Sequence, residues 1–156
     1  MNRIKETAKR IKQYINDHIF EIVTVKQLKN EIKIPIGTIR FCFKQCYKVY
    51  PKEYIEWGKI TLFAVLCRAG GKADKNTVKE YTADLGYFST DSLCKLIKRM
   101  VKMDMCSFCE AVLDNDFYYK LLDNPFIRIN VSTFGVANGV AFVEAIFLKY
   151  HIDKAK

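Results

Sequence analysis

Proline, glycine and histidine are scarce in this 156-residue chain, which contains 3 Pro, 7 Gly and 2 His. So little proline and glycine excludes a fibrous repeat and argues against disorder. No apolar run reaches the roughly 18 residues that a membrane-spanning helix needs, and the longest run, 139–148, contains Glu144. The first residues, MNRIKETAKRIKQ, have no apolar centre, unlike a secretory signal. We therefore expect a cytoplasmic protein that makes no contact with a membrane.

Groups that commonly carry catalysis are also few. The two histidines, His18 and His151, lie near opposite ends of the chain, and we interpret His18 as structural. The sequence has no glycine-rich phosphate loop, no zinc-hydrolase histidine pair and no evident pair of catalytic carboxylates. We expect neither enzymatic activity nor a cofactor.

Six cysteines are present, and two pairs have the spacing of metal ligands: Cys42 with Cys46, and Cys106 with Cys109. Without a secretory signal we expect reduced thiols. A four-cysteine zinc site would require both pairs to converge. Because both pairs fall within apolar helical patterns, we interpret the cysteines as small buried side chains. A metal or redox role is the alternative.

What the chain has in quantity is apolar material and positive charge. Half of the residues are hydrophobic, including 11 Phe and 9 Tyr, which is enough for a core. The formal net charge is +9, and it is unevenly distributed. Residues 1–102 hold 21 Lys and Arg against 10 Asp and Glu, whereas residues 103–156 hold 5 against 7. A basic body indicates a polyanionic partner, with an ordinary solvated surface as the alternative.

Apolar spacing predicts a series of helices. The first covers 4–17, with Ile4, Ala8, Ile11 and Ile15 on one face. Thr24 followed by Gln27 is a capping-box pattern, which predicts a helix ending near Lys33. Pro35 then favours a helix start, so a second short helix follows over about 36–46. A longer helix is expected over 51–68, before Gly70 and Gly71.

The same plan returns about 54 residues later. Thr77 is expected to begin a short helix that ends at Gly86. Ser89, Thr90 and Asp91 are good N-cap residues for the next helix, over about 89–101. The sequence therefore predicts two helix-turn-helix units joined by a central helix.

In this layout the sequence resembles the DNA-binding domain of the AraC-type transcriptional regulators. The segments that carry the resemblance are IKQYINDH (11–18), residues 24–34, FKQCYKVYPKEYI (43–55) and LGYFSTDSLCKLIKRMVKMDMCSF (85–108). It covers roughly residues 8–110 and implies a mostly α fold, with this domain over 4–112. Because the match begins close to Met1, the chain resembles the short, stand-alone members of the family.

The resemblance implies sequence-specific binding of double-stranded DNA, with helices 36–46 and 89–101 in adjacent segments of the major groove. Such a regulator would be associated with the nucleoid and would also contact RNA polymerase or another protein. Carried over by position, the DNA-contacting residues are Gly37, Thr38, Arg40, Phe41, Lys44, Ser89, Thr90, Asp91, Lys95, Lys98 and Arg99. Arg40 would grip guanine and Phe41 a thymine methyl, while Lys44, Lys98 and Arg99 would hold phosphates.

Each of these roles has an alternative. Asp91 is favoured as a helix cap over a base contact, and Thr90 suits either role. Core packing competes with DNA contact for Phe41. For Arg40 and Lys95 the alternative is a plain solvated charge.

The chain also departs from the family pattern. Lysine or threonine stands where alanine is usual in the first helix of each unit, at Lys29 and Thr82. Lysines stand where glycine is usual, at Lys33, Lys48 and Lys102. Met105 replaces a proline. These departures mark a divergent member.

The C-terminal extension, 113–156, has no counterpart in the resemblance. Residues 126–134, FIRINVSTF, alternate as in a strand, and 135–150 are apolar and typical of a helix. The extension is expected to pack on the second unit, with dimerisation or binding of another protein as alternatives. The competing functional hypothesis is accordingly a protein-interaction module that uses this apolar extension on a double helix-turn-helix scaffold with little DNA binding. A third hypothesis is RNA binding through the positive charge of the basic body.

Overall fold

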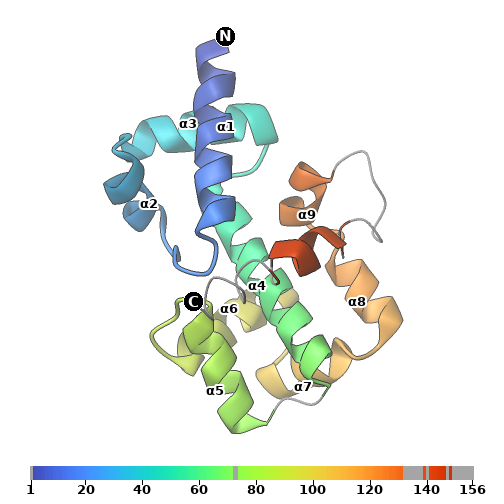
Figure 1. The fold of residues 1–156 in the computed structure, drawn as a ribbon. Coiled ribbons are helices and arrows are strands. Elements are labelled where there is room, and N and C mark those ends of the chain that lie inside the picture. Colours follow the sequence, from blue (N-terminus) through green and yellow to red (C-terminus); the bar gives the residue numbers. More distant parts are fainter. Residues whose placement is uncertain (1, 72–73, 132–138, 140, 147, 149–156) are drawn as a thin grey trace.

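The computed structural model describes residues 2–71, 74–131, 139, 141–146 and 148. Over these residues the regular structure is helical, with no strand, as the mostly α prediction required (Figure 1). Nine helices have bounds within the described ranges: α1 (Asn2–Asp17), α2 (Val25–Ile32), α3 (Ile36–Tyr47), α4 (Pro51–Gly70), α5 (Lys75–Asp84), α6 (Thr90–Val101), α7 (Met105–Ala111), α8 (Asn115–Leu121) and α9 (Pro125–Asn130).

The central helix α4 organises the molecule. In Figure 1, α1–α3 lie at one end of α4, α5–α7 lie at the other end, and α8 and α9 lie along its side. Most of its length is buried, from Tyr54 to Cys67, so neighbours cover it on nearly all sides. Gly58 makes one close approach possible, because a Cβ there would lie 2.9 Å from Ile19 Cδ1 and 3.0 Å from the Phe126 ring.

Local signals account for the first three helices. The capping box is present, since the Gln27 amide donates to Thr24 Oγ1 at 3.1 Å and the Thr24 amide donates to Gln27 Oε1 at 2.9 Å. Pro35 occupies the N-cap position of α3 without a side-chain cap, and the helix begins at Ile36, as the predicted bounds required. The inward residues of these helices form one core, which includes Ile11 and Ile15 of the predicted face of α1 together with Leu28, Ile39 and Phe43. The predicted bounds of all three helices are confirmed within two residues.

Three lysines end helices in the left-handed conformation. Lys33, Lys48 and Lys102 follow α2, α3 and α6 with φ of 60°, 65° and 67°. They are the positions where the resemblance implies glycine. The left-handed region costs a side-chain-bearing residue about 1–2 kcal/mol. The three helix ends therefore have the left-handed backbone conformation that glycine adopts most easily, although lysine occupies each position.

The start of α5 differs from the prediction. Asp74, and not Thr77, is its N-cap, and the Asp74 carboxylate accepts the Thr77 amide at 2.8 Å. Thr77 lies inside the first turn. Both residues are good cap formers, and the apolar pattern that begins at Val78 could not distinguish them.

Short helices follow α6 at a regular interval, the first just before the extension and the next two within it. Asp104, Asp114 and Asn124 are the N-caps of α7, α8 and α9, and each accepts an amide from the turn that follows. These helices pack on α4. Arg68 donates to the Val112 carbonyl at 2.8 Å, and Asn124 donates to Thr61 Oγ1 at 3.0 Å. The extension thus folds against its own chain through Val131, chiefly on the central helix.

The predicted strand is wrong where the structure describes it. Residues 125–130 form α9, which begins with the strong start signal Asn124–Pro125. Phe126 and Ile127 are both buried, which a strand with one wet face would not allow. Residues 132–134 lie outside the described residues. Of the predicted helix over 135–150, residues 139, 141–146 and 148 are helical. The other positions of that prediction lie outside the described residues.

Candidate nucleic-acid interface

All the expected DNA-contacting residues of α3 are exposed: Gly37, Thr38, Arg40, Phe41 and Lys44. The opposite face of the helix buries Ile39, Cys42 and Phe43. This division places the candidate residues on one solvent-facing surface of α3.

Two neighbouring side chains on this surface are particularly open. Phe41 is 56% exposed, so its alternative role in the core is wrong. The Arg40 guanidinium has no hydrogen-bond or ion-pair partner among the described residues. A cation and an apolar ring therefore stand side by side on α3 without an intramolecular role.

Lys44 is held at the end of the same helix. Its Nζ donates to the Lys48 carbonyl at 3.0 Å and lies 4.7 Å from the centroid of the Tyr50 ring. A cation at a helix C-terminus is favourable, because the last carbonyls carry partial negative charge. Its charge thus lies beyond the base-reading end of α3.

The N-terminus of α6 corrects one prediction. Ser89 is the cap, with extended φ and ψ of −143° and 153°, and its Oγ accepts the Ser92 amide at 3.4 Å. Thr90 is half-buried as the first helical residue. Asp91, favoured as a cap from the sequence, lies inside the first turn, because only one residue can hold the cap position. Its carboxylate instead pairs with Lys95 Nζ at 3.0 Å.

The basic residues of α6 are partly neutralised within the chain. Lys95 is exposed but paired with Asp91, and Arg99 forms an ion pair with Glu56 of α4. Another Arg99 nitrogen lies 3.4 Å from Met100 Sδ. Lys98 is exposed. The second helix thus presents less uncompensated charge than its sequence suggested.

Phe88 is a candidate that the sequence reading missed. Its side chain is fully exposed, immediately before the Ser89 cap of α6. Its neighbour Tyr87 is half-buried, with its ring centroid 5.7 Å from Lys59 Nζ. Because successive side chains of extended backbone point to opposite sides, the pair Tyr87–Phe88 was a usable signal that one ring faces water.

A buried lysine holds the turn before α6. Lys59 of α4 has no exposed surface, and its Nζ donates to the Leu85 carbonyl. Burial lowers the Lys59 pKa to about 7, and the nearby Glu21 opposes this only in part. Gly86 adopts φ of 88°, and a Cβ there would lie 2.8 Å from the Phe20 carbonyl oxygen. The turn is thereby fixed between α4 and the loop that follows α1.

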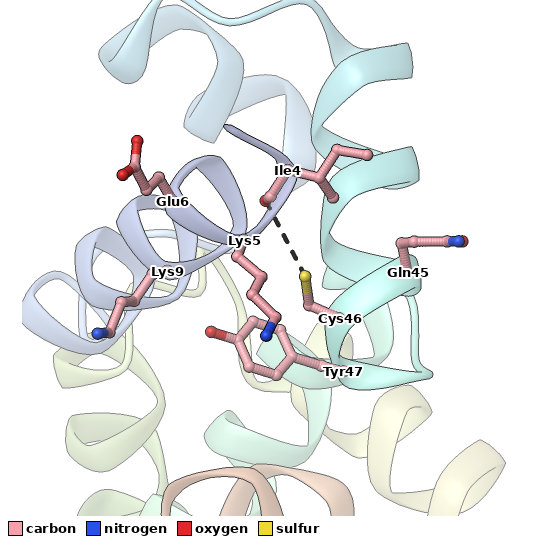
Figure 2. Close-up of a pocket in the computed structure, with 7 residues that line it drawn as sticks. All are labelled: Ile4, Lys5, Glu6, Lys9, Gln45, Cys46 and Tyr47. Atoms are coloured by element: carbon pink, nitrogen blue, oxygen red, sulfur yellow. Dashed lines mark hydrogen bonds between the residues drawn. The ribbon is translucent and has the colours of Figure 1, made fainter. Parts of the chain in front are cut away.

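A groove lies between α1 and the end of α3, with a volume of about 860 Å³ (Figure 2). Its walls are formed by Ile4, Lys5, Glu6, Lys9, Gln45, Cys46 and Tyr47. Figure 2 shows Lys5 reaching toward the Tyr47 ring. Lys12 Nζ lies 5.4 Å from that ring's centroid, and burial, followed by the charge of Lys9, lowers the Lys12 pKa. The groove therefore has two lysines, Lys5 and Lys9, and one carboxylate, Glu6, in its walls beside α3.

Helices α3 and α6 repeat with a constant offset. Each has 12 residues, and their starts, Ile36 and Thr90, are 54 positions apart. Their left-handed caps, Lys48 and Lys102, have the same separation, as have the starts of the following helices at Pro51 and Met105. Buried positions correspond in the same way: Ile39 with Leu93, Cys42 with Leu96, and Phe43 with Ile97.

The cysteines do not gather around a common centre. Cys42 and Cys46 lie on α3, whereas Cys106 and Cys109 lie on α7, and Cys106 is exposed, contrary to the expected burial. Within the described ranges, no group of three or more His, Cys, Asp or Glu side chains is placed to hold a metal ion. Cys67 and Cys109 do meet, with their Sγ atoms 3.9 Å apart.

Among the described helices, none combines the length and apolar character that crossing a membrane requires. Comparisons of the chain with protein-family models, with curated proteins and with solved structures found no match.

Proposed function

We propose that this protein is a sequence-specific DNA-binding transcriptional regulator built on two helix-turn-helix units. In this proposal α2–α3 and α5–α6 are the units, α4 joins them, and α3 and α6 enter adjacent segments of the major groove. The observation that carries the proposal is the repeat of α3 and α6, with the same positions buried and basic side chains on the outward face of each. The excess of basic residues in 1–102 supplies the attraction to phosphate.

The chemistry follows from the outward residues of α3. Arg40 has the planar pair of donors that matches guanine O6 and N7, and it has no partner among the residues that the structure describes. Phe41 offers an apolar surface to a thymine methyl group. Lys44, nearer the helix end, would bind the phosphate backbone.

The second helix has a weaker claim to base recognition. Lys95 would have to break its ion pair with Asp91, and Arg99 its ion pair with Glu56, before either could contact DNA. Lys98 and the Ser89 end of α6 are suited to phosphate contacts. We therefore assign base reading mainly to α3 and backbone binding mainly to α6.

The competing proposal, a protein-interaction module, has less support. It needs an apolar extension that is available to a partner, yet Phe126, Ile127 and Val143 are buried against the rest of the chain. Leu113, Tyr119 and Leu148 remain exposed there. Tyr119 and Leu148 line one pocket of about 360 Å³, and Leu113 lines another, so these exposed apolar residues are divided between two places.

The test is fluorescence anisotropy of the purified protein with labelled duplex DNA over a series of salt concentrations. Binding should weaken steeply with salt. With duplexes selected from a random pool, Arg40→Ala should lose about 1–3 kcal/mol of binding free energy and some sequence preference. Lys95→Ala should lose less, because that charge is already paired.

Lys120→Ala is the matched control, since it removes an equal charge from the exposed surface of α8. It should leave binding nearly unchanged. If duplex binding is undetectable even at low salt, the regulator proposal fails. Equal losses in Arg40→Ala and Lys120→Ala would mean attraction by charge alone.

A further inference from the structure

Two cysteines from distant parts of the chain meet where α4 packs on α7. Cys67 of α4 is buried, with 1% of its surface exposed, and Cys109 of α7 is half-buried. Their Sγ atoms lie 3.9 Å apart, close enough for a thiol–thiol hydrogen bond. Both thiols are reduced in this structure. A disulfide bond needs the two sulfurs at about 2.0 Å, so only a modest approach separates this pair from a bond.

One of the two cysteines lines a pocket. It has a volume of about 450 Å³ and lies between the start of α5, the start of α6 and α7. Cys109 and Cys106 line it together with Val78, Met105 and Leu113, whereas Cys67 does not. A small oxidant would therefore reach Cys109 first, with Cys67 placed behind it.

We propose that Cys67 and Cys109 form a dithiol site that a hydroperoxide oxidises to an intramolecular disulfide. The arrangement assigns different parts to the two residues: Cys109 is the attacking thiol and Cys67 resolves the intermediate. The hydrogen bond from the Cys67 thiol lowers the Cys109 pKa, which favours the reactive thiolate at that position. The Cys67 pKa is raised by the same contact and by burial, so that sulfur keeps its proton.

The reaction proceeds in two steps. The Cys109 thiolate attacks one peroxide oxygen, an S–O bond forms, the O–O bond breaks, and the leaving oxygen takes up a proton as water or an alcohol. The Cys67 sulfur then attacks the Cys109 sulfur. An S–S bond forms, the S–O bond breaks, and the departing hydroxide takes the Cys67 proton to leave as water. Two thiols are oxidised by two electrons, and one hydroperoxide is reduced.

This site does not depend on DNA binding. The experiment treats the full-length reduced protein with hydrogen peroxide and counts its thiols after denaturation. The count should fall from six to four. Tryptic digestion should then yield one new species, residues 60–68 joined to residues 103–120, which dithiothreitol separates.

Variants identify the sulfurs, because peptide 103–120 contains both Cys106 and Cys109. Cys106→Ser should retain the cross-link, and Cys109→Ser should lose it while keeping a wild-type circular dichroism spectrum. The proposal is overturned if all six thiols survive peroxide, if the link joins 80–95 through Cys94, or if covalent dimers form instead. The thiol count, a non-reducing gel and the wild-type digest together distinguish these outcomes, so the test stands even if a variant fails to fold.

Discussion

Helices α3 and α6 have the same length, the same kind of left-handed cap and corresponding buried positions, yet their outward side chains differ in what they contact. On α3, Arg40 has no partner in the described part of the chain, and Phe41 projects into solvent. On α6, Lys95 and Arg99 are each paired with a carboxylate.

This difference shows that the formation of the two helices and the availability of their charged side chains have separate causes. A repeated pattern of apolar residues is enough to build two equivalent helices, because burial depends only on which positions face the core. The availability of each charge depends on single neighbours, such as Glu56 beside Arg99. The two helices can therefore share a fold and differ in function.

The largest expected effect tests the shared scaffold. Phe43→Ala should reduce the free energy of unfolding by about 3–5 kcal/mol, because it leaves a cavity beside the rings of Tyr47 and Tyr54. Ile97→Ala, at the corresponding place in α6, should cost somewhat less. Urea denaturation measures both. Phe41→Ala is the control, with an expected change within about 0.5 kcal/mol. An equally large loss there would contradict the exposed position of Phe41.

The next effect is a pH dependence of stability. It arises from Lys59 of α4, whose side chain binds the turn before α6. The folded-state Lys59 pKa is about 7, below its ordinary value of 10.5. Between these pH values the unfolded chain binds a proton that the folded chain lacks. Stability should therefore increase from pH 7 upward, by at most about 1.4 kcal/mol per pH unit, and be lost again as pH falls toward 7.

Urea midpoints measured from pH 6.5 to 9.5 test this, with Lys59→Met as the comparison. The variant lacks the titrating group, so wild type should gain stability relative to it as pH rises. The tyrosines and cysteines that begin to titrate toward the upper end of this range are the same in both proteins, so their contribution cancels from the difference. A constant difference between the two proteins across the range would show that Lys59 does not titrate there.

A smaller effect compares the two left-handed caps. Lys102→Gly should raise the free energy of unfolding by about 0.5–1 kcal/mol. Glycine adopts a positive φ without strain, and this gain is partly offset because glycine loses more conformational entropy on folding. Lys48→Gly should gain less, since it also removes the bond from Lys48 Nζ to the Gln45 carbonyl at 3.0 Å. Thermal unfolding measures both changes. A lower melting temperature for Lys102→Gly would refute the strain argument.

The smallest effect would make the two helices more alike, and it depends on the proposed function. Glu56→Gln releases Arg99 from its ion pair and should strengthen duplex binding by about 0.5 kcal/mol at low salt. Glu53→Gln removes an equal charge from the same helix without touching Arg99, so it should gain less. Anisotropy measures both variants. Equal gains would mean that only net charge matters.

The features predicted well from the sequence depend on residues close together in the chain. Three such features are the capping box at Thr24, the break at Pro35 and the apolar spacing of α1. Each involves neighbours within a few positions, so the local sequence is enough to predict it. The outward face of α3 follows from the same periodicity. Where two local signals competed, the cap was misplaced by three residues (Thr77 for Asp74) and by two residues (Asp91 for Ser89).

By itself, the sequence determined the helical class, the 54-residue repeat and the residues that face outward from α3 and α6. Only the tertiary structure decided that 125–130 is a helix against α4, that Lys59 is buried, that Glu56 engages Arg99 and that Cys67 meets Cys109. Each of these depends on residues far apart in the chain, whose approach is set by how whole helices pack. A periodic pattern shows which face of a helix is buried, but it does not contain the identity of the neighbour that covers it.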